Sequence, residues 1–99
     1  MKDKAQKLIE KYEELESELG NPDVLADQAR YNKIHKQYKG IEKAVQKAKE
    51  YLQLVNDLAE YKEALGDPDP EMVAMAKSEI SDIEKKLPGV TDELQILMV

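Results

Sequence analysis

The sequence is marked first by residue types that it lacks. It contains no cysteine, which excludes a disulfide framework and thiolate metal sites and fits a cytoplasmic protein. It also contains no phenylalanine and no tryptophan, so five tyrosines are its only large aromatic side chains. A core of Leu, Ile, Val, Ala and Tyr suits thin seams between helices better than a thick globular interior.

Several kinds of functional segment are missing as well. No apolar run approaches the roughly 20 residues of a membrane span, and the charged stretch 1–6 does not resemble a signal peptide. The four glycines are isolated, so there is no glycine-rich phosphate loop. The single histidine, His35, cannot form a metal cluster or a catalytic triad alone. We therefore predict that the chain is not an enzyme and uses no cofactor or metal.

Charge arranged with a helical period is what the sequence does contain. Charged residues make up 36% of the chain, and 99 residues are enough for one small domain. Apolar residues recur at alternating spacings of three and four, which is typical of amphipathic helices. We predict an all-α fold: an elongated, three-helix antiparallel bundle resembling a coiled coil, with one long central helix and a short C-terminal segment.

Capping residues and breakers set the expected helix bounds. The predicted helices span residues 2–19, 28–65 and 70–87, with a short turn at 22–25 and a last segment over 91–98. The apolar heptad does not slip at Gly40, so we expect the long helix to continue through it, either straight or with a bend. Pro88-Gly89 is expected to break the third helix. The apolar seam of the long helix changes face at Tyr51, so the first and third helices should pack on different faces.

A basic block on the long helix points most clearly towards a partner. Residues 30–49 contain seven basic residues and one acid, Glu42, although the whole chain carries a net charge of −6. At 100° per residue, five lysines lie opposite the apolar heptad of this stretch. We call them the lysine stripe: Lys33, Lys36, Lys39, Lys43 and Lys47.

The lysine stripe allows two interpretations. Glu16 and Glu18 of the first helix could reach Arg30 across the interface, but the five lysines point away from that interface. They are then left either as a solvated face that keeps the domain soluble or as a contact for an anionic partner, ribosomal RNA or an acidic protein surface. The tyrosines and most of the methionines are interpreted as core residues rather than as binding groups.

A series of short motifs follows the whole chain in a specific order. They are Tyr12-x-x-Leu15, Asn21-Pro22-Asp23-Val24, Arg30-Tyr31, Glu50-Tyr51, Asp69-Pro70-Glu71-Met72 and Asp92-Glu93-Leu94-Gln95-Ile96-Leu97. In this order they resemble the N-terminal helical domain of bacterial peptide chain release factor 1, a class I release factor family. The resemblance implies a role in translation termination, through contact with the ribosome near the GTPase-associated centre and interplay with the recycling GTPase release factor.

The resemblance also implies what this sequence would lack. Full-length members recognise stop codons with a Pro-x-Thr-type motif and trigger hydrolysis with a Gly-Gly-Gln motif, and neither occurs here. The chain thus resembles a fragment without the codon-recognition and Gly-Gly-Gln domains, and without catalysis of its own. The alternatives are a helical coiled-coil adaptor or a tRNA-binding helical arm. The apolar tail at residues 94–99 is expected to fold back or to drive weak self-association.

Overall fold

The computed structural model describes all 99 residues and contains five helices and no strand. The helices are α1 (Lys2–Leu19), α2 (Pro22–Leu25), α3 (Gln28–Gly40), α4 (Glu42–Ala64) and α5 (Pro70–Leu97). The radius of gyration is 18.6 Å, against about 13 Å for a compact domain of this length. The predicted all-α, elongated fold is confirmed.

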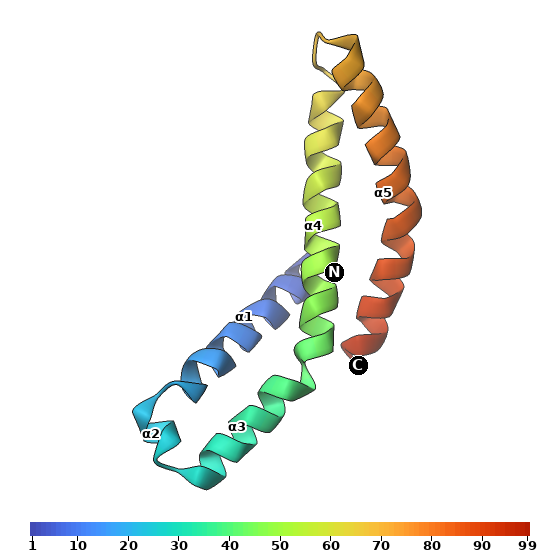
Figure 1. Cartoon of the computed structure of the whole chain (residues 1–99). Coiled ribbons are helices and arrows are strands. Elements are labelled where there is room, and N and C mark those ends of the chain that lie inside the picture. The colour runs from blue at the N-terminus through green and yellow to red at the C-terminus, as the bar shows by residue number, and fades with distance from the viewer.

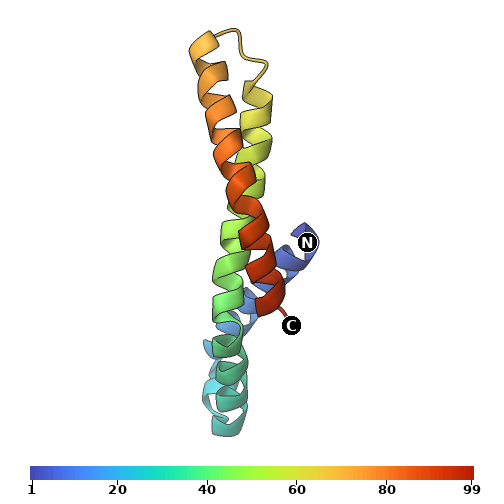
Figure 2. The same cartoon turned by 90° about the vertical axis from the view of Figure 1, so that its right-hand side faces the viewer.

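The helices form two arms that meet at an angle (Figure 1). One arm is an antiparallel hairpin of α4 and α5, which lie side by side in both views (Figures 1 and 2). The other arm contains α2, α3 and most of α1, and α1 packs against both α3 and α4. The first and third helices were expected to pack near opposite ends of the long helix, but α1 and α5 both meet α4 at Ala48.

Side-chain caps fix three of the helix starts. The Oδ1 atom of Asn21 accepts the Asp23 N–H at 2.9 Å, and that of Asp27 accepts the Arg30 N–H at 3.1 Å. Asp69 likewise accepts the Glu71 N–H at 3.0 Å, with Pro70 at the first helical position. These bonds satisfy backbone donors that have no partner in the first turn of a helix.

The long central helix predicted over residues 28–65 is divided, and that prediction is wrong. Ile41 separates α3 from α4 with φ −103° and ψ 0°, and Figure 1 shows the chain bending there. Gly40, the last residue of α3, costs a helix about 1 kcal/mol relative to alanine. One non-helical residue leaves the heptad spacing intact, which is why the sequence pattern does not reveal the bend.

The predicted break at Pro88-Gly89 is also wrong, because α5 continues to Leu97. Proline removes one backbone donor and costs a helix interior about 3 kcal/mol. Beyond it, however, Val90 is 6% exposed and Leu94 is fully buried. Burying two such side chains stabilises the continued helix by a comparable amount, about 1.5–3 kcal/mol each. The segment expected at 91–98 is therefore the last part of α5.

The core consists of thin seams, as the composition predicts: 11 residues are buried, and all of them are apolar. One cluster joins Leu15, Val24 and Ile34 of α1, α2 and α3. A second cluster joins Ala5, Ala48 and Leu94 of α1, α4 and α5. The two small alanines allow three helices to meet closely around Leu94. The apolar tail is thus partly folded back on α1, while Ile96, Leu97 and Val99 stay exposed.

Candidate partner-binding surface

The lysine stripe is shared between two helices. Lys33, Lys36 and Lys39 lie on α3, whereas Lys43 and Lys47 lie on α4, beyond the bend at Ile41. Lys33, Lys36 and Lys43 are exposed, and none of them forms an ion pair. These three lysines are the part of the stripe that is free to meet a partner.

Lys39 belongs to the exposed surface but already has a neighbour of opposite charge. Its Nζ atom lies 3.2 Å from Oε2 of Glu42, across the bend. The two side chains are 58% and 35% exposed. Such exposed pairs contribute little to stability, about 0–1 kcal/mol, and exchange readily for other charges. Lys39 is therefore weakly paired and still accessible.

Lys47 differs from the other four lysines because the fold itself uses it. Its Nζ atom lies 2.9 Å from Oε2 of Glu50 and 2.9 Å from Oε2 of Glu93, and its side chain is only 24% exposed. The hydrogen bonds to Glu50 and Glu93 raise the pKa of Lys47 above its usual value. Lys47 was expected to face solvent or a partner, but Glu93 of α5 reaches it because that helix does not stop at Leu87.

An aromatic contact joins α1 and α3, where an ion pair was expected. The rings of Tyr12 and Tyr38 stack with centroids 4.3 Å apart, and the Tyr38 hydroxyl donates to Oε2 of Glu16 at 3.2 Å. The neighbouring Tyr12 hydroxyl, partial burial and the Glu16 carboxylate together raise the pKa of Tyr38 well above its usual value. Arg30 forms no ion pair, so the predicted contact of Glu16 and Glu18 with Arg30 is wrong.

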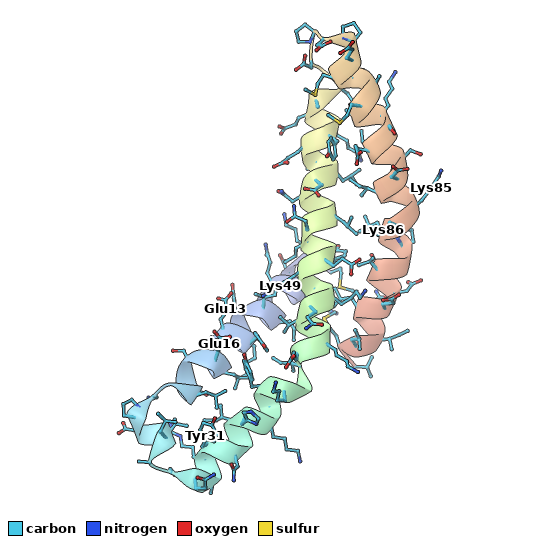
Figure 3. All side chains as sticks on the ribbon, in the orientation of Figure 1. Glu13, Glu16, Tyr31, Lys49, Lys85 and Lys86 are labelled. Carbon is cyan, nitrogen blue, oxygen red and sulfur yellow. The ribbon has the colours of Figure 1, made fainter.

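The single histidine lies against an aromatic side chain of the same helix. His35 stacks on Tyr31 with ring centroids 5.9 Å apart, and Tyr31 packs against the α1–α2–α3 cluster. Figure 3 shows Tyr31 in the arm formed by α2 and α3. No group of three or more His, Cys, Asp or Glu side chains is placed to hold a metal ion. No helix has the length and apolarity that crossing a membrane requires.

Comparison with known proteins shows which family the chain belongs to. The PCRF domain model matches residues 8–99, nearly the whole chain. The chain belongs to the PCRF domain family. This PCRF domain is 42% identical over 96 residues to peptide chain release factor 1 of Oleidesulfovibrio alaskensis, covering 97% of the chain and 27% of that protein. It is 32% identical over 99 residues to peptide chain release factor 1 of Acidobacterium capsulatum, covering 100% and 28%.

These relatives confirm the resemblance seen in the sequence motifs and define its extent. The PCRF domain spans 27–28% of the length of the curated relatives given above. A third relative, peptide chain release factor 1 of Nitratidesulfovibrio vulgaris, is 40% identical over 96 residues, covering 97% of the chain and 27% of that protein. No solved structure matches the chain.

Proposed function

We propose that this PCRF domain is the N-terminal ribosome-binding domain of a cytoplasmic translation termination factor. Its similarity to proteins named peptide chain release factor 1, over 97% of the chain or more in the relatives above, supports this proposal. The domain binds the ribosome and thereby positions the factor, and it does no chemistry itself. The contact lies near the GTPase-associated centre of the large subunit, on ribosomal RNA or a ribosomal protein, and it influences the interplay with the recycling GTPase release factor.

The free part of the lysine stripe is the proposed contact surface. Lys33, Lys36 and Lys43 are exposed, unpaired and set on both sides of the bend, and this observation carries the assignment. Lys39 adds a weakly paired fourth charge, whereas Lys47 is held by Glu50 and Glu93. Contacts of this kind with phosphate groups release bound counterions, so the affinity falls as salt is added.

Charge reversal tests the contact surface directly. In the triple variant Lys33→Glu/Lys36→Glu/Lys43→Glu we expect roughly 10- to 100-fold weaker binding to ribosomes, measured by co-sedimentation at two salt concentrations. The dependence of affinity on salt should also become shallower, because fewer counterions are released. Circular dichroism should show unchanged helix content, since the three side chains are exposed and unpaired.

A matched control separates a local contact from an effect of net charge. Lys77, Lys85 and Lys86 are exposed and unpaired on α5, and Figure 3 shows Lys85 and Lys86 far from α3. Reversal of these three lysines makes the same charge change and should leave ribosome binding within about twofold, because salt screens the effect of charges that lie outside the contact surface. Equal losses in both triple variants would show that the lysine stripe is only a solubilising face.

The same samples distinguish the other interpretations of this domain. A tRNA-binding arm should bind free tRNA without the ribosome, and an adaptor should bind neither. Weak self-association is proposed through the exposed apolar residues Ile96, Leu97 and Val99. Sedimentation velocity over a range of concentrations should then show a rising sedimentation coefficient, whereas a strict monomer would contradict it.

A further inference from the structure

The far end of the α4–α5 hairpin combines exposed apolar side chains that the core does not use. Leu65 is 40% exposed, Met72 38% and Met75 41%. Most of the four methionines were expected in the core, but Met72 and Met75 lie at the surface. We call residues 63–75, which contain these side chains and the loop between α4 and α5, the hairpin tip.

The three apolar side chains lie at the same end of the hairpin because of the helix alignment. Leu54 and Tyr61 of α4 line the same hollow as Ile83 and Glu79 of α5. In an antiparallel pair this alignment places Leu65 directly opposite the turn of α5 that carries Met72 and Met75. Both ends of the chain lie away from the tip, as Figures 1 and 2 show. The apolar surface is thus free on a projecting end of the molecule.

The charge around this surface selects the kind of partner. The hairpin tip contains four acids and no basic residue: Glu63, Asp67, Asp69 and Glu71. Phosphate-bearing partners such as RNA or anionic lipid would be repelled here, whereas lysine and arginine side chains would be attracted. Methionine side chains adapt to irregular apolar surfaces, and amphipathic helices commonly use them as a docking site.

Two side-chain hydrogen bonds and two prolines restrict the loop at the tip. Oδ1 of Asp67 accepts the Asp69 N–H at 2.8 Å, and Oδ1 of Asp69 accepts the Glu71 N–H at 3.0 Å. Pro68 and Pro70 fix two further backbone angles. A preorganised loop loses little conformational entropy on binding. We propose that the hairpin tip docks a basic amphipathic helical segment of a partner protein, separately from the lysine stripe.

The proposal is tested with a synthetic helical peptide of leucine and lysine, using nitrogen-15-labelled protein and amide chemical shifts. The expected shift changes are confined to residues 63–75. Met72→Ser/Met75→Ser should weaken binding about tenfold, because two apolar side chains no longer pack against the peptide. Glu63→Gln/Glu71→Gln keeps the methionines and should weaken binding mainly at low salt.

A second acidic region of the same chain provides the matched control. Glu13 and Glu14 on α1 are exposed, and residues 10–18 contain no exposed large apolar side chain. Glu13→Gln/Glu14→Gln makes the same charge change as the tip variant and should leave peptide affinity unchanged. Shift changes spread equally over α1, or equal losses from the two glutamine pairs, would overturn the proposal, as would the absence of shifts at the tip. No ribosome is involved, so this outcome is independent of the proposed termination function.

Discussion

Truncation of Leu94 is the sharpest test of how α5 docks. Leu94 is fully buried between Ala5 and Ala48, where α1, α4 and α5 meet. Leu94→Ala removes three carbon atoms, each contributing about 0.8 kcal/mol by transfer from water. The cavity left by these atoms adds about 24 cal/mol per Å³ wherever the two alanines cannot close around it. We expect a loss of about 2.5–4 kcal/mol in the free energy of unfolding.

The measurement is urea unfolding followed by far-ultraviolet circular dichroism, with the slope of the transition checked for constancy. Leu97→Ala is the matched control, since Leu97 lies three residues further along α5 and is 40% exposed. It should cost less than about 1 kcal/mol, as surface truncations usually do. Equal losses in the two variants would show that the part of α5 beyond Pro88 does not dock, and the Lys47–Glu93 contact would then be refuted with it.

Three further changes test individual features of the structure. Gly40→Ala should stabilise the domain by about 0.5–1 kcal/mol in urea unfolding, because a Cβ there meets no atom within 4 Å; destabilisation would show that the bend needs glycine. Lys47→Gln should lower the melting temperature more than Lys43→Gln, because of these two lysines only Lys47 forms an ion pair between α4 and α5. Equal changes in melting temperature would contradict this role. Because the pKa of Tyr38 is raised in the folded state, its protonated hydroxyl stabilises the fold below about pH 10. This stabilisation is lost as the pH rises from there through the raised pKa. Phenolate absorbance should therefore include a tyrosine that ionises well above pH 10 and that is absent in Tyr38→Phe. If this component persisted in the variant, the raised pKa would belong to another tyrosine.

Much of the fold could be predicted from the sequence because its local signals are strong. Asn21, Asp27 and Asp69 stand just before helices that the sequence predicts, and each side chain accepts a backbone N–H two or three residues ahead. The period of apolar residues likewise predicted thin seams and an elongated shape. These features depend on neighbours in sequence, which a pattern of spacing describes well.

The features that the sequence did not predict depend on contacts between distant residues. The helix passes Pro88 because Val90 and Leu94 are buried beyond it, and this burial requires α1 and α4 to be in place. The division at Ile41 leaves the heptad unchanged, so no spacing signal marks it. The role of Lys47 follows from the first of these: once α5 extends past Leu87, Glu93 reaches the lysine stripe.

The part of the lysine stripe on α3 is connected to the α4–α5 hairpin mainly through α1. Its residue Ala5 enters the cluster that holds the α4–α5 hairpin, and its residue Leu15 enters the cluster that holds α3. Between the arms the direct path is interrupted at Ile41, where regular helical geometry is absent. The angle between the free lysines on α3 and the acidic hairpin tip is therefore set by the side chains along α1. Packing of α1 therefore fixes how the two arms of this molecule, which is 61 Å long, are oriented relative to each other.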